Sequence, residues 1–311
     1  MDNWVDVAFF TTWLAASVRL AGPVMLAALG EVLSERAGVL NIGIEGVILL
    51  GALGAYLGAA GSGSAWVGLL AAAGVGLVCG LLLSWMYVSA RASQVVTGIV
   101  FNLLALGLAS FVYRQAVAAG FSESVPMLEP AAWQQDLAKL PLVGPALFGQ
   151  PPLLYATLGL AALASFVLYR TRFGLSVRAV GENPRAADAA GISVVKTRYA
   201  GVLISSVAAA LAGAYLMVCE VGLFRDGIVS GQGFIALAIV ILGHWSPGRV
   251  ALAALLFGAA DALQLSLQLR GWGLPPQVLL AFPYVLALLA ICGVFGRSTR
   301  QPRALMQPLE N

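Results

Sequence analysis

Apolar residues gather in runs of about 20 along this chain, and short polar breaks separate the runs. A helix needs about 20 apolar residues to cross the roughly 30 Å hydrocarbon core of a bilayer, so each run predicts a transmembrane helix. Nine runs stand out, at residues 7–30, 39–60, 64–89, 94–113, 151–170, 199–218, 231–245, 249–269 and 277–296. The pattern predicts an all-α, polytopic membrane helical bundle of about nine transmembrane helices, in one transmembrane domain over residues 1–311.

Two of these regions depart from a simple span. Residues 231–245 are short for a full crossing. Residues 31–60 join the polar stretch RAGVLNIGIEG to an apolar run, and they fit either a continuous helix or a broken, re-entrant one. Membrane proteins tolerate non-helical backbone at this depth where it is buried in protein or lines a cavity. A similar polar break before an apolar helix recurs at FRDGIVSGQGFIALAIVIL, which suggests two related halves, as in many transporters.

Composition and charge agree with a membrane location. Of 311 residues, 60% are apolar and 10% are charged, against roughly 25% charged in a soluble domain. Cytoplasmic loops hold the excess of Lys and Arg, so we place the C-terminus inside and, with nine spans, the N-terminus outside. This puts on the cytoplasmic side Arg36, Arg91, Arg170, Arg172, Arg178, Arg185, Lys196, Arg198, Arg249, Arg297, Arg300 and Arg303. The net charge of +3 reflects this asymmetry and gives no indication of nucleic-acid binding.

Two long polar connections fall on opposite faces of the predicted membrane. Residues 114–150 form an external loop, and residues 171–198 form a cytoplasmic loop. Within the cytoplasmic loop, Asn183-Pro184 marks a helix start and Gly191 a helix stop. So short a helix is marginal in water, so it should pack against a partner protein or against the ends of its own spans.

The residues that catalysis would require are missing from the pattern. The only histidine, His244, lies at the predicted end of a span, and the three cysteines show no metal-like spacing. No G-x-x-x-x-G-K-[ST] loop occurs, so any dependence on ATP must come from another subunit. We therefore expect no catalytic residue, no metal and no cofactor in this chain.

Polar residues beside the apolar runs are the candidate transport residues. Asn41 and Glu45 are four positions apart, so on a helix they would share a face. We expect them to line a solute pathway near its cytoplasmic end, together with Gln232 from the recurring segment. The alternative is that Glu45 caps the start of its own helix or pairs with Arg36.

Two opposite charges lie near the middle of their predicted spans. Arg19 and Asp261 are each costly alone in hydrocarbon, which predicts that they pair; separate polar or solvated environments are the alternative. An ion-coupled secondary transporter would require acidic residues at mid-membrane. The chain offers only Asp261 well inside a span, with Glu45 near an end, which weighs against that class.

Longer motifs, taken in order, resemble one protein family over about residues 20–296. They include LAALGEVLSERAGVLNIGIEGVILLGALGAY, ASQVVTGIVFNLLALGLASFVYR, TRFGLSVRAVGENPRAADAAGISVVKTRYAG and GQGFIALAIVILGHWSPGR. The chain resembles the permease subunits of bacterial ABC importers, in the branch associated with nucleosides and simple sugars. Ribose and branched-chain amino acid permeases are more distant members.

The resemblance implies a function and a set of partners. It implies that the protein carries a nucleoside or simple sugar across the bacterial inner membrane. The implied partners are a cytoplasmic ATP-binding subunit, a second permease subunit, and an external solute-binding protein or lipoprotein. The helix at Pro184–Gly191 matches the segment that seats against the ATPase, which implies a coupling role for Glu182, Asn183, Pro184, Ala187 and Gly191.

Overall fold

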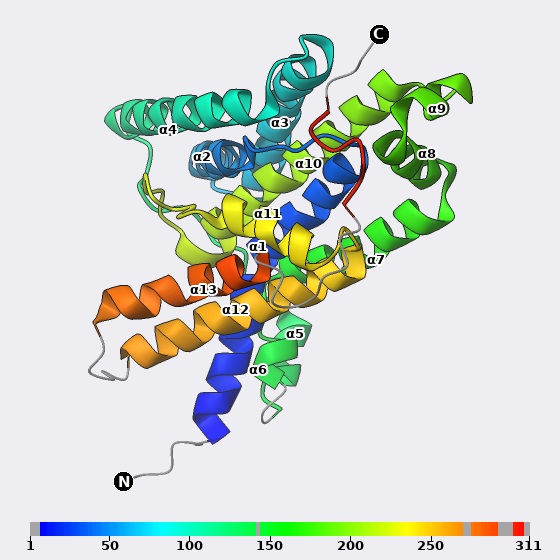
Figure 1. Ribbon diagram of the computed structural model, residues 1–311. Helices are drawn as coiled ribbons and strands as arrows, with labels where there is room; N and C mark the ends of the chain where they lie inside the picture. The colour runs from blue at the N-terminus through cyan, green and yellow to red at the C-terminus, as the bar shows by residue number, and fades with distance from the viewer. Residues whose placement is uncertain (1–6, 141–143, 270–274, 292–300, 308–311) are drawn as a thin grey trace.

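The computed structural model describes residues 7–140, 144–269, 275–291 and 301–307, and their regular structure is helical. The helices are α1 (Val7–Arg36), α2 (Ile44–Ser62), α3 (Ala65–Ser84), α4 (Gln94–Ala118), α5 (Ala132–Leu137), α6 (Gly144–Leu147), α7 (Pro152–Arg170), α8 (Arg172–Glu182), α9 (Pro184–Ala189), α10 (Val194–Tyr215), α11 (Gln232–Leu242), α12 (Pro247–Leu269) and α13 (Pro276–Ile291). Two π-helical segments, η1 (Trp85–Ser89) and η2 (Leu216–Val221), extend α3 and α10. Figure 1 shows the helices crossing one another in a single bundle.

The predicted multi-span bundle is confirmed. Among the described residues, seven helices are long and apolar enough to cross a membrane: α1, α2, α4, α7, α12, and α3 and α10 with their π-helical extensions. The other two predicted spans fall on α11, with 11 residues, and α13, with 16. At 1.5 Å per residue α11 is about 16 Å long, or half of the hydrocarbon core.

Residues 31–60 form a broken helix. Helix α1 runs through to Arg36, and α2 begins only at Ile44. The intervening residues 37–43 are non-helical but largely buried inside the bundle. Of the continuous and broken forms that the sequence left open, the structure therefore has the broken one.

The centre of the bundle consists of α1, α2, α3 and α10, which pack closely through small residues. A Cβ placed on Gly213 of α10 would lie 1.9 Å from the carbonyl oxygen of Ile48 in α2. Likewise, a Cβ on Gly51 would lie 2.3 Å from the carbonyl oxygen of Ala210. Without side chains at these crossings the two backbones touch directly, which is a common way to associate helices in lipid.

The two long connections lie at opposite ends of α1. At one end, the side chain of Gln150, just after α6, donates to the carbonyl of Ala15, at 3.0 Å. At the other end, Gly181 of α8 packs against the carbonyl oxygen of Arg36. In Figure 1, α8 and α9 accordingly lie far from the start of α1.

The crossing of α2 and α10 can be tested with one methyl group. We expect Gly213→Ala to destabilise the protein by about 1–3 kcal/mol, because the new Cβ would meet backbone that can yield only by separating the helices. The matched control is Gly107→Ala on α4, where an added Cβ has no neighbour within 4 Å. Melting temperatures in detergent provide the measurement, and equal values for the two variants would contradict the close crossing.

Candidate functional site

The break between α1 and α2 is held by side chains from its surroundings. Two side chains, one from α1 and one from α4, bond to its backbone. The hydroxyl of Ser34 donates to the carbonyl of Val39 at 2.8 Å, and the amide of Leu40 donates to Gln94 Oε1 at 2.8 Å. Backbone groups at membrane depth have no water to bond, so each needs a partner within the protein. Polar residues at the ends of neighbouring helices supply these partners.

Asn41 lies at the centre of this break in a fully buried polar cluster. Its backbone amide donates to Glu31 Oε1 at 2.9 Å. In its side chain, Nδ2 donates to the hydroxyl of Ser205 and Oδ1 accepts from the hydroxyl of Tyr87, each at 3.4 Å. The Ser205 hydroxyl in turn donates to Glu31 Oε2. Asn41 has no exposed surface, so in this conformation it belongs to the interior of the bundle.

Asn102 of α4 secures the end of the break. Its Nδ2 donates to the carbonyl of Ile42 at 3.0 Å, and its Oδ1 accepts from the amide of Gly46 at 2.8 Å. The same side chain thus satisfies a carbonyl of the break and one of the first amides of α2, which have no partner within the helix.

Glu45 joins the start of α2 to the start of α11. Its Oε1 accepts from the amide of Gly231 at 2.8 Å, and its Oε2 accepts from the amide of Gly233 at 2.7 Å. Gly233 packs so closely that a Cβ there would lie 2.8 Å from Glu45 Cα. A carboxylate at a helix N-terminus is stabilised by the helix dipole and by its amides. The two recurring segments of the sequence therefore meet at this carboxylate.

These contacts correct the predicted geometry around Glu45. Asn41 lies before α2, so it does not share a helical face with Glu45; the backbone turns away to meet Glu31 and Asn102. Glu45 does cap a helix, but that helix is α11 and not its own. Gln232 begins α11, half-buried, with an Oε1 atom that is buried without a hydrogen-bond partner.

Arg19 and Asp261 are not brought together as an ion pair. Arg19 of α1 is exposed and Asp261 of α12 is half-buried, and no salt bridge joins these two described residues. Instead, Glu220 in η2 lies within electrostatic range of both side chains. A third ionisable side chain, which the sequence argument did not consider, therefore interacts with both.

Glu31 and Glu35 are buried carboxylates that the sequence argument missed. Both are essentially unexposed on α1, although only Asp261 was expected well inside a span. Trp245 Nε1 donates to Glu35, while Arg36 Nε donates to the carbonyl of Trp245 at 2.9 Å. The spacing of Glu31 and Glu35, four residues apart in GEVLSER, is the signal that could have placed them on one helical face.

The segment expected to contact an ATPase folds as a short helix, α9, with conventional ends. Asn183 caps α9 by accepting from the amide of Ala186 at 3.1 Å, and Pro184 occupies the first turn. Gly191 follows the helix with φ of 81°, a conformation that favours glycine. Glu182, directly before the cap, is exposed.

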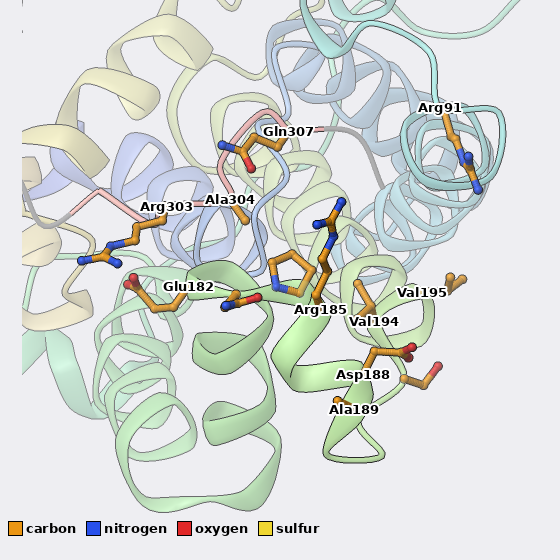
Figure 2. Close-up of a pocket in the computed structure, with 13 residues that line it drawn as sticks. Arg91, Glu182, Arg185, Asp188, Ala189, Val194, Val195, Arg303, Ala304 and Gln307 are labelled. Carbon is orange, nitrogen blue, oxygen red and sulfur yellow. The ribbon is translucent and has the colours of Figure 1, made fainter. Parts of the chain in front are cut away.

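Ala187 faces the protein and not the surroundings. It packs in a small cluster with Val180 and Val194, so it attaches α9 to α8 and α10. The outer face of the helix carries Ala186 and Ala190. In this structure Ala187 therefore anchors α9, and the exposed alanines lie on a different face of the helix. Figure 2 shows the third side of α9, where Arg185 and Asp188 line a cavity.

A helical membrane bundle with a buried, non-helical break and a short apolar helix that starts against it is typical of transport proteins. Residues 13–291 match the family described as "Branched-chain amino acid transport system / permease component". The chain belongs to this family of ABC transporter permeases.

Three relatives match over most of their length. The putative glucose ABC transporter permease protein TsgC13 of Haloferax volcanii is 39% identical, covering 88% of this chain and 83% of that protein. The guanosine ABC transporter permease protein NupQ of Bacillus subtilis is 37% identical, with coverages of 91% and 92%. The nucleoside ABC transporter permease protein NupC of Lactococcus lactis is 35% identical, with coverages of 89% and 90%. No solved structure matches the chain.

The bridge at Glu45 can be tested by removing its charge. In Glu45→Gln the side-chain NH₂ would face one of the two amide donors, so we expect a loss of about 1–3 kcal/mol, the range for an unsatisfied buried group. The control is Glu129→Gln, at an exposed position of the loop before α5. Melting temperatures of the two purified variants would be compared, and an unchanged value for Glu45→Gln would mean that the bridge does not hold α11.

Proposed function

We propose that this chain is the transmembrane subunit of an ATP-driven importer that carries a nucleoside, or else a simple sugar, into the cytoplasm. The match of residues 13–291 to permease components carries this proposal. The names of the relatives support the cargo class, because they specify guanosine, nucleosides and glucose. All of these are small polar molecules rich in hydroxyl groups.

The energy would come from a separate ATP-binding subunit on the cytoplasmic side. The sequence has no phosphate-binding loop, so this chain would need no ATP site or other cofactor of its own. The exposed outer face of α9 supports a contact with such a subunit. A second permease subunit and an external solute-binding protein would complete the complex, in the inner membrane with the C-terminus inside.

Asn41, Glu45 and Gln232 remain the proposed polar lining of the pathway. Their support is positional: Glu45 contacts the start of α11, and the buried Oε1 of Gln232, the first residue of α11, has no hydrogen-bond partner. A hydroxyl-rich solute could bond to such groups. Asn41, being fully buried, would contact a solute only after the break between α1 and α2 moves.

Ion-coupled transport is the alternative, and the buried carboxylates Glu31 and Glu35 are the observation in its favour. Such carboxylates inside a membrane bundle can serve as proton or sodium sites. Both oxygens of Glu31 are engaged, by Asn41 and Ser205, which gives Glu31 a structural role that needs no ion. Glu35 accepts from Trp245 at Oε2, while its buried Oε1 has no hydrogen-bond partner, so Glu35 is the residue that favours the alternative.

Uptake by the purified complex in proteoliposomes distinguishes these functions. We expect labelled guanosine to accumulate only when ATP is supplied to the cytoplasmic side, and excess unlabelled adenosine, but not glucose, to compete. ATP-dependent accumulation of labelled glucose, with none of guanosine, would assign the sugar cargo. Accumulation that needs no ATP and collapses with an ionophore would replace the proposal with secondary transport.

The two neighbouring alanines of α9 provide a matched test of coupling. We expect Ala186→Trp, on the outer face, to leave the permease folded while reducing uptake at least about tenfold, because the added ring would obstruct a seated partner. Ala187→Trp should lower the melting temperature instead, since that site is filled by Val180 and Val194. Full uptake by a folded Ala186→Trp complex would exclude the outer face from the contact.

A further inference from the structure

The C-terminal segment, residues 301–307, is a folded part of the cytoplasmic end. Pro302 and Ala304 are buried, and the amide of Ala304 donates to the carbonyl of Gly181 at 2.8 Å. The Nη1 atom of Arg198, a side chain that is only 1% exposed, donates to the carbonyl of Gln307 at 3.1 Å. These contacts attach the segment to α8 and α10, directly beside α9.

A cavity of about 810 Å³ lies between this segment and α9. Arg303 and Gln307 line it from the C-terminal segment, and Arg185 and Asp188 line it from α9. Figure 2 shows the two groups on different sides of the cavity, with Arg91 on a further side. The cavity is thus a space with two walls, and the α9 wall adjoins the outer face that the proposed function assigns to the ATP-binding subunit.

The charges around this cavity indicate which kind of partner surface would fit it. Three arginines, at positions 91, 185 and 303, line it together with two carboxylates, at 182 and 188. The positive surplus favours an acidic occupant, while the presence of both signs matches a protein surface better than a small anion. The volume also exceeds what a single phosphate would fill.

We propose that the C-terminal segment is the second wall of the ATPase seat, so that an acidic segment of the ATP-binding subunit is held between residues 301–307 and α9. This inference rests on the proposed function, and it adds a contact surface outside the coupling helix. Arg303 is the central residue, because it is exposed, lines the cavity and belongs to the new wall alone.

This second wall is in direct contact with the break between α1 and α2. A Cβ on Gly38, within the break, would lie 3.1 Å from the carbonyl oxygen of Ala304. Gly181, which bonds to Ala304, also packs on Arg36 at the end of α1. A partner that moves the C-terminal segment would therefore act on the broken helix by a route that does not pass through α9.

Charge reversal at Arg303 tests the proposal in the assembled complex. The amount of ATP-binding subunit retained on the tagged permease would be measured for Arg303→Glu, Arg303→Lys and Arg249→Glu, together with uptake. We expect Arg303→Glu to reduce retention about tenfold or more, since like charges across an interface are strongly unfavourable, and Arg303→Lys to remain near the parental level. Arg249→Glu is the control, an exposed arginine at the start of α12 outside the cavity lining.

Parental retention and uptake by Arg303→Glu would overturn the second wall, as would equal losses in Arg303→Glu and Arg249→Glu. Loss of the ATPase from Ala186→Trp but not from Arg303→Glu would overturn this inference alone and leave the proposed function standing. A parental permease that retains no ATP-binding subunit would overturn the proposed function and this inference with it. Because Arg303 is exposed, its variants should keep the parental melting temperature. Measuring that temperature for each variant is the control for a folded permease.

Discussion

An amide or carbonyl group at membrane depth must find its hydrogen-bond partner within the protein, and this requirement organises the interior of the permease. Interrupting a helix exposes several such groups at once. The break after α1 is satisfied by side chains from α1 and α4, and the start of α11 by one carboxylate from α2. The polar residues inside these apolar helices are therefore placed by the needs of the backbone.

The same requirement connects the structure to transport. A pathway for a hydroxyl-rich solute needs polar groups in the interior, and interrupted helices place them there without isolated charges. In this conformation most of those groups are already bonded to one another, as Asn41 is to Glu31 and Tyr87. Exchange of such internal bonds for bonds to a passing solute would keep the binding weak, which suits a protein that must release its cargo.

The sequence was most informative where the cause of a structure is local. Run lengths predicted the spans, and Asn183, Pro184 and Gly191 predicted the short helix α9, because caps and stops act within one turn. Charge spacing was less informative. The partner of Glu45 is about 190 residues away, and nothing in the neighbouring sequence identifies it. The inward direction of Ala187 was equally hidden, since it depends on Val180 and Val194 packing from either side.

The glycine crossing between α2 and α10 also determines how these helices can move. At Gly51 and Gly213 the two backbones touch with no side chain of their own between them. Separating the helices at this point would lose a direct backbone contact that no side chain could follow. The crossing is therefore a fixed point about which the surrounding helices are arranged, and any movement of α2 in transport has to carry α10 with it.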